Sequence, residues 1–125
     1  MAEVEAKLKQ DLFVEIKNLE QNHGVIRSFI SGKDYDALII GGTLQTFKDS
    51  LSRASAFVLA LYNLKGKRVN IPWEPLFTSL DYALATIGVS SSPKQKEAVR
   101  TILAMSEEQM EQVLSYFSAL KDSLK

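Results

Sequence analysis

The chain has 125 residues, and its 15 lysines and arginines balance 15 aspartates and glutamates, so its formal net charge is zero. This balance argues against a protein whose main work is to neutralise nucleic acid or to lie on an anionic membrane. The absence of cysteine excludes disulfides, thiolate catalysis and cysteine-based metal sites, and the length predicts a single helical domain over residues 1–125.

The N-terminal segment predicts an amphipathic helix over residues 3–21. Apolar side chains recur every three or four positions among charged ones: Val4, Leu8, Leu12, Ile16 and Leu19. We expect Asn22, His23 and Gly24 to end this helix, because glycine adopts the left-handed backbone that closes helix ends. The apolar residues within 25–30 then predict one or two further helical turns.

The strongest pattern predicts one long central helix over about residues 34–63. Apolar residues recur there at alternating intervals of three and four positions: Ala37, Ile40, Leu44, Phe47, Leu51, Ala54, Val58 and Leu61. A repeat of this kind is typical of helices that pack along a seam in coiled coils and bundles. Asp34 or Asp36 can cap the start of this helix, which would be about 45 Å long at about 1.5 Å per residue.

Gly41 and Gly42 allow a different interpretation of this segment. Residues 38–40 could form a strand, and the two glycines could form a phosphate-binding turn before a helix capped by Thr43. The apolar repeat continues across both glycines without a shift, however, and no Gly-Lys-Ser/Thr or spaced third glycine follows. We therefore favour the helix, in which the missing side chains would let another helix approach closely.

Three shorter helices complete the predicted fold. The first follows Trp73 and ends at Gly88, and the other two begin at the capping boxes Ser92–Gln95 and Ser106–Gln109. Because short connections favour antiparallel neighbours, we predict an all-α fold, a compact antiparallel bundle of about five helices.

The sequence offers few groups for catalysis or metal binding. Glu20 and His23 have the Glu-x-x-His spacing of di-iron bundles, but a single histidine cannot supply a second such element. We therefore expect His23 to be a capping or solvent-exposed residue. Arg53 lacks the nearby histidine of helical ribonucleases that use such a pair, and no serine has an evident neighbouring base. We predict no enzyme activity, no cofactor and no metal.

The region Phe57–Tyr62 is apolar on every side, and a helix of this kind must be buried on every side. The chain's own core can cover it, and a dimer interface could do so as well. We predict a non-catalytic protein-interaction module, either a homo-oligomer or a small subunit of a larger assembly. The candidate partner-binding residues are Tyr35, Phe57, Leu59, Tyr62 and Trp73.

A basic loop supports a second hypothesis, an auxiliary nucleic-acid-contacting subunit of a nucleoprotein complex. Three positive charges without a compensating acid occupy residues 65–68, and a predicted helix adds three more. The candidate phosphate-binding residues are Lys65, Lys67, Arg68, Lys94, Lys96 and Arg100. Tyr62 and Trp73 flank the loop and could stack on bases. A third hypothesis is a small-molecule sensor with an apolar cavity between helices.

The N-terminal segment is charged and periodic and lacks the apolar core of a signal peptide. No stretch without charge approaches the roughly 20 residues that a membrane-spanning helix needs. We therefore expect a cytoplasmic protein without contact with a membrane.

Overall fold

Five helices make up the part of the chain that the computed structural model describes, residues 2–70, 73–87 and 92–124. They are α1 (Ala2–Ile30), α2 (Ala37–Leu64), α3 (Glu74–Ile87), α4 (Pro93–Met105) and α5 (Glu107–Leu124). These ranges contain no strand, and the helices share one buried apolar cluster. The predicted all-α antiparallel bundle of about five helices is confirmed.

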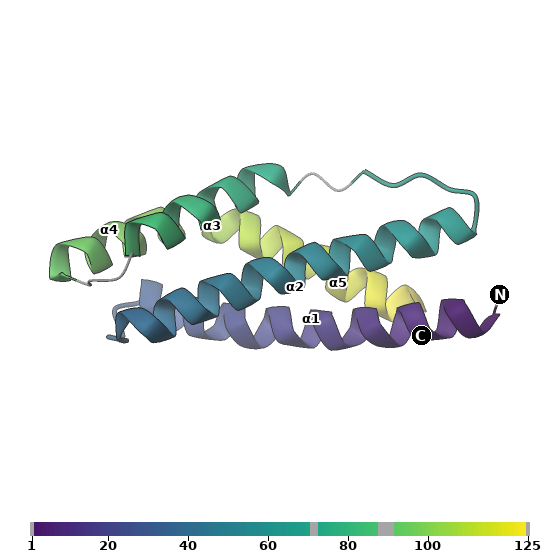
Figure 1. The fold of residues 1–125 in the computed structure, drawn as a ribbon, viewed down its shortest axis with the longest axis horizontal. Helices are drawn as coiled ribbons and strands as arrows, with labels where there is room; N and C mark the ends of the chain where they lie inside the picture. The colour runs from purple at the N-terminus through teal and green to yellow at the C-terminus, as the bar shows by residue number, and fades with distance from the viewer. Residues whose placement is uncertain (1, 71–72, 88–91, 125) are drawn as a thin grey trace.

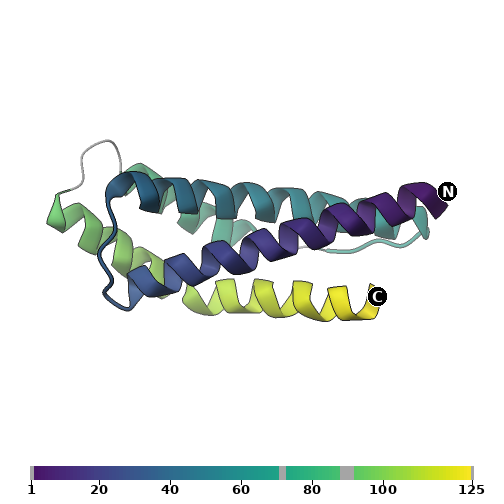
Figure 2. The ribbon, with the colours of Figure 1, turned by 90° about the horizontal axis from the view of Figure 1, so that it is seen from below.

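Successive helices run antiparallel to each other, except that α4 and α5 run in the same direction and together form the last antiparallel segment. α1 and α2 pack along each other as a long hairpin, and α3 returns over the first half of α2 (Figure 1). α4 and α5 then follow each other in the same direction, with α4 beside α3 and α5 beside α1 (Figure 2). The last helix therefore closes the core against the first.

α2 confirms the predicted long helix and its seam. Its start is capped by Asp36, whose side chain accepts a hydrogen bond of 2.9 Å from the backbone N–H of Ile39. The helix continues through Gly41 and Gly42, so a strand followed by a phosphate-binding turn is the wrong interpretation. A Cβ on Gly41 would lie 3.8 Å from Cγ2 of Ile87, which shows how closely α3 approaches α2 at this glycine.

α1 is longer than predicted, because it continues through Gly24 to Ile30. The expectation that residues 22–24 end the helix is wrong. The buried face of α1 extends past Leu19 through His23, Ile26 and Phe29, and this burial outweighs the roughly 1 kcal/mol that a glycine costs inside a helix. α1 has 29 residues and α2 has 28, so the bundle contains two long helices of nearly equal length.

The two predicted capping boxes have different outcomes. At Ser92 the box is confirmed, because the Ser92 hydroxyl accepts from the Gln95 N–H and the Gln95 side chain accepts from the Ser92 N–H. At Ser106 it is wrong: the hydroxyl donates to the carbonyl oxygen of Ile102 at 3.0 Å. The backbone of Ser106 is helical, with φ −98° and ψ 0°, whereas a capping residue is extended. α4 and α5 therefore meet at a single residue.

The core runs the length of the bundle. Its largest fully buried side chains include one phenylalanine each from α1, α2 and α5, namely Phe29, Phe47 and Phe117. None of the described helices combines the length and the apolar character that crossing a bilayer would require.

Candidate interaction surfaces

The predicted partner-binding residues lie mostly inside the chain's own core. Tyr35, Phe57, Tyr62 and Trp73 are partly buried and pack against the core cluster. Leu59 is the exception, with 42% of its surface exposed on the outer side of α2. Most of the apolar turn at the end of α2 is thus covered without a partner. That these five residues bind another molecule stays a prediction.

Trp73 lies in the connection between α2 and α3, and its side chain packs against α5. Its ring centroid lies 5.6 Å from that of Tyr116 in an edge-on arrangement and 6.4 Å from that of Phe117. Burial raises the pKa of the Tyr116 hydroxyl above its ordinary value. The indole ring is therefore engaged in internal packing, and its stacking on bases stays a prediction.

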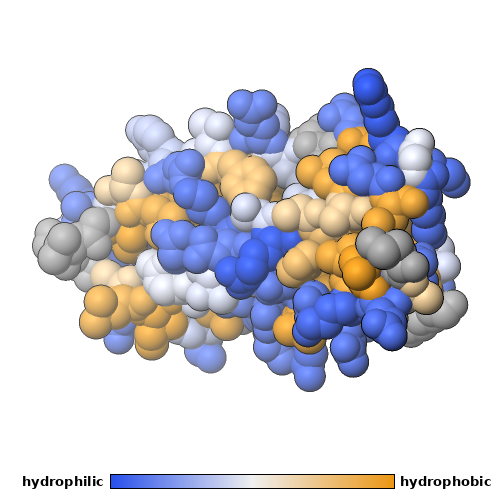
Figure 3. All heavy atoms as spheres, turned by 45° about the vertical axis from the view of Figure 1, so that its right-hand side comes forward, coloured by the Kyte–Doolittle hydropathy of each residue, from blue (hydrophilic) through white to orange (hydrophobic). Residues whose placement is uncertain are grey.

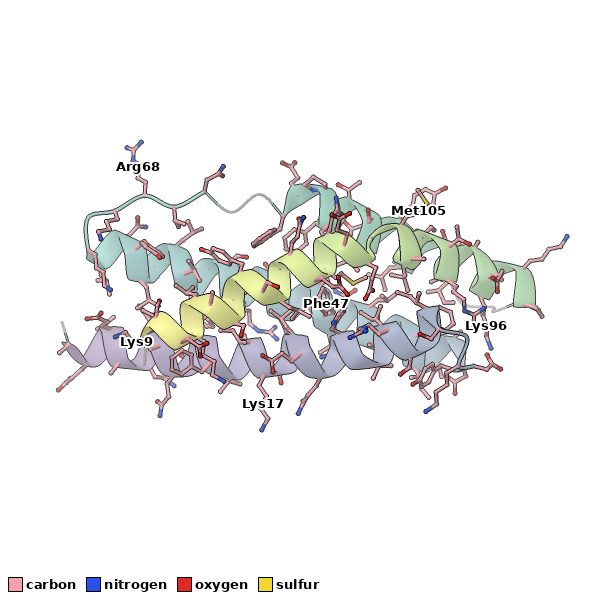
Figure 4. All side chains as sticks on the ribbon, turned by 180° about the vertical axis from the view of Figure 1, so that it is seen from behind. Lys9, Lys17, Phe47, Arg68, Lys96 and Met105 are labelled. Carbon is pink, nitrogen blue, oxygen red and sulfur yellow. The ribbon has the colours of Figure 1, made fainter. Side chains whose placement is uncertain are left out.

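The basic loop begins at a glycine turn. Gly66 has φ +67°, and the N–H of Lys67 donates to the carbonyl oxygen of Tyr62 at 2.9 Å, which closes the end of α2. Lys65 Nζ lies 3.8 Å from Glu5 Oε1. Lys67 and Arg68 are exposed and have no ion-pair partner within the described ranges, and Arg68 points away from the helices (Figure 4).

The basic residues of α4 are placed differently. Lys96 pairs with Asp34 at 3.3 Å, while Lys94 is exposed. Arg100 donates from Nε to the carbonyl oxygen of Phe29 at 2.8 Å, and its guanidinium lies 4.5 Å from the centroid of that ring. Arg100 thus joins α4 to the end of α1, a structural role.

The structure does not bring the two basic groups together. Lys65 follows the last residue of α2, whereas Asp34, the partner of Lys96, precedes the first. A helix of 28 residues separates these two positions by about 42 Å. Figure 4 shows Arg68 and Lys96 at opposite ends of the bundle.

His23 is buried, so the expectation of a capping or solvent-exposed histidine is wrong. It lies in α1, about two turns before the helix ends, with 6% of its surface exposed, and its Nε2 is 3.3 Å from Glu107 Oε1 at the start of α5. Nε2 has no hydrogen-bond partner in the described part of the chain. Burial lowers the pKa of His23, and the positive charge of Arg27 adds to this effect, while Glu107 opposes it.

Glu15 is the second buried polar group of α1, with 7% of its surface exposed. Arg53 of α2 donates to it from both Nε and Nη2, the latter at 3.2 Å, and Asn18 Nδ2 donates at 3.2 Å. Burial alone raises the pKa of Glu15, but these hydrogen bonds outweigh it and hold the pKa below its ordinary value. Arg53 is therefore a structural partner of Glu15.

The candidate di-iron motif does not assemble into a ligand set. Glu20 is exposed, while the carboxylate that faces His23 comes from Glu107. Among the described residues, no group of three or more histidine, aspartate or glutamate side chains is arranged to hold a metal ion.

Sequence reasoning missed an exposed apolar surface at the start of α2. Leu38 has 88% of its surface exposed and Ile39 has 48%. Gly42 lies on the same side of the helix, one turn further on, and no atom lies within 4 Å of the position that a Cβ would occupy there. We call Leu38, Ile39 and Gly42 the α2 N-terminal patch. The signal was available, because Leu38 and Ile39 stand outside the apolar repeat that forms the seam.

Exposed apolar side chains lie at both ends of α2, and Val14, Tyr82 and Met105 are exposed elsewhere. In Figure 3 apolar surface lies at the two ends of the visible face, with a hydrophilic belt between them. Leu38 and Ile39 belong to one end of α2, and Leu59 and Leu64 belong to the other.

No protein-family model, no curated protein and no solved structure matches this chain.

Proposed function

We propose that the chain is a non-catalytic protein-interaction module that pairs with a second copy of itself through the α2 N-terminal patch. The observation that carries this proposal is the exposure of Leu38, the most exposed of the large apolar side chains within the described ranges. Covering a leucine side chain fully contributes about 1.5–3 kcal/mol, which a monomer forgoes.

The geometry of the patch suits a helix as its partner. Leu38 and Ile39 stand one turn before Gly42, where the backbone of α2 is uncovered. Two large side chains beside a glycine form a knob and a shallow hole, and a second helix can approach the backbone closely there.

Charge favours a second copy of the chain as this partner. The formal net charge is zero, so two molecules approach without long-range repulsion. Two-fold pairing places the same residues against each other.

Leu38→Glu tests the proposal. We expect light scattering of the unchanged protein to give a mass that rises with concentration toward twice that of one chain. Leu38→Glu should hold the protein at the mass of one chain, because a buried glutamate without a partner opposes pairing. The matched control is Val14→Glu, which changes a 58% exposed apolar residue on α1.

Three outcomes would contradict the proposal in different ways. A single-chain mass at every concentration removes self-association. Pairing that survives Leu38→Glu but is lost in Leu59→Glu moves the interface to the predicted surface at the other end of α2. Equal loss of pairing in Val14→Glu means that an added negative charge reduces pairing wherever it is placed, so that Leu38 has no special role. Circular dichroism of each variant confirms that the helices remain.

Nucleic-acid contact through the basic loop is the second candidate. It is favoured by the exposed ammonium and guanidinium groups of Lys67 and Arg68, which lack ion-pair partners in the described part of the chain. The variant Lys67→Ala/Arg68→Ala should weaken binding to a single-stranded oligonucleotide and reduce its salt dependence. Unchanged binding, or no binding at low salt, would contradict this function.

A further inference from the structure

A pocket opens where α2 and α5 both end, at the opposite end of α2 from the α2 N-terminal patch. It has a volume of about 170 Å³ and is formed by the last turns of the two helices together with the start of the basic loop. Its walls come from segments more than 50 residues apart in the sequence, so no local sequence pattern predicts the pocket.

The floor of the pocket is apolar. Val58 and Leu61 of α2 and Leu120 of α5 line it, and all three are buried. A cavity of about 150 Å³ between aliphatic side chains is large enough to hold benzene. The pocket therefore has room for one aromatic ring or a short alkyl chain, which would lie against these aliphatic side chains and against Tyr62 and Leu124, which also line the pocket.

The mouth of the pocket is basic. Lys65 and Lys67 line it beside Ser123. Lys65 shares Glu5 Oε1, at 3.8 Å, with Lys9 Nζ, at 3.6 Å, and both distances are longer than a direct hydrogen bond. Lys9 lies at this end of the bundle (Figure 4).

The ion pairs of the described residues neutralise only part of the positive charge at the mouth. Lys67 has no ion-pair partner within the described ranges. The Ser123 hydroxyl donates to the carbonyl oxygen of Leu120 at 2.9 Å, which leaves its own oxygen able to accept. Counting Lys9, Lys65 and Lys67 against Glu5, these four residues carry a net positive charge.

We propose that this pocket binds a small amphiphilic carboxylate, with its ring or short alkyl chain on the floor and its carboxylate between Lys65 and Lys67. A carboxylate matches the net positive charge of Lys65, Lys67 and their neighbours, and an apolar body matches the floor. The site is independent of the proposed self-association, because the whole length of α2 separates it from Leu38.

Titration with 3-phenylpropanoate, followed by amide chemical shifts in two-dimensional NMR, tests the proposal. We expect saturable shifts near Val58, Lys67 and Leu120 with a dissociation constant in about the millimolar range, which is typical of a ligand of this size. The uncharged 3-phenylpropan-1-ol has the same body, and it should bind at least about tenfold more weakly because it lacks the charge that the lysines recognise.

Two pairs of variants test separately the contact of the carboxylate with Lys67 and the binding of the apolar group inside the pocket. Lys67→Met should weaken binding of the carboxylate several-fold and leave binding of the alcohol unchanged, while Lys17→Met, on the outer face of α1 (Figure 4), should change neither. Ser123→Trp should block the mouth, and the same substitution at Ser115, an exposed residue of α5 away from the pocket, should not. Both changed serines are exposed, so the core stays intact.

Several results would overturn the proposal. No saturable shift at about 10 mM in the folded protein would remove the site. Equal affinity for the alcohol would remove the role of the lysines, and full binding in Ser123→Trp would place the ligand elsewhere. Binding of phenyl phosphate about tenfold tighter than that of 3-phenylpropanoate would replace the carboxylate by a phosphate monoester.

Discussion

Glu15 and His23 are two buried polar groups on the same face of α1, two turns apart, and their surroundings differ. Glu15 receives hydrogen bonds from Arg53 and Asn18, so its charge is compensated. His23 faces Glu107, yet neither its Nε2 nor Glu107 Oε2 has a hydrogen-bond partner among the described residues. The α1–α2 hairpin thus satisfies its buried charge, whereas the contact between α1 and α5 leaves polar groups without hydrogen bonds.

The largest effect is expected from Arg53→Ala. This change leaves the buried Glu15 without a positive partner, with only the uncharged Asn18 and Ser50 side chains beside it, and it should lower the free energy of unfolding by about 1–3 kcal/mol in urea titrations. Lys48→Ala is the matched control on the same helix, because it removes an ion pair with the exposed Asp81 and should cost less than about 1 kcal/mol. Equal losses in the two variants would contradict the compensation that we assign to Arg53.

An effect of intermediate size is expected from pH. Burial lowers the pKa of His23 in the folded chain. In the unfolded chain His23 binds a proton at about pH 6.5, the ordinary value, whereas in the folded chain it binds the proton only at lower pH. Stability should therefore decrease as the pH falls from about 7.5 through 6.5 toward the lower pKa of the folded state. The slope should not exceed about 1.4 kcal/mol per pH unit for one proton.

His23→Gln isolates this contribution. The variant should show a flat free energy of unfolding over the same pH window, since glutamine does not titrate. The contribution of Glu15 is separate, because its pKa lies below its ordinary value of 4.5, and the stability it provides is lost only at more acidic pH. If His23→Gln keeps the slope of the unchanged protein, another group causes it.

The smallest effect is expected at Gly24, next to His23. Gly24 is exposed within α1, and a Cβ added there would meet no atom within 4 Å. Gly24→Ala should raise the free energy of unfolding by about 0.5–1 kcal/mol in thermal melts, because alanine is favoured inside helices. Gly66→Ala should do the opposite, since φ there is +67°. A destabilised Gly24→Ala would mean that α1 is interrupted beside His23.

The helices were predictable where burial and periodicity agree. In α2 the apolar repeat crosses Gly41 and Gly42 unbroken, and the structure follows the repeat. In α1 the prediction of a helix end rests on Gly24, although His23 occupies the next position of the series Leu12, Ile16 and Leu19. Extending that series would have placed His23 in the core.

The candidate surfaces were less predictable, because they depend on which helices meet. The apolar turn at the end of α2 required burial, but its sequence does not say that the loop carrying Trp73 and the helix α5 provide it. Ser106 has the residues of a capping box, and only the continuation of α4 into α5 shows that its hydroxyl turns to Ile102. The pairing of Lys96 with Asp34 likewise joins segments 62 positions apart.

The closure of the core by α5 against α1 has a consequence for synthesis of the protein. The hairpin of α1 and α2 contains contacts between neighbouring segments, so it can form as soon as both helices have left the ribosome. His23 and its neighbours stay uncovered until Glu107 and Phe117, much later in the chain, have also been synthesised. Until α5 has emerged, the nascent chain carries an uncovered apolar stripe, and it is in this interval that we expect chaperones to be needed.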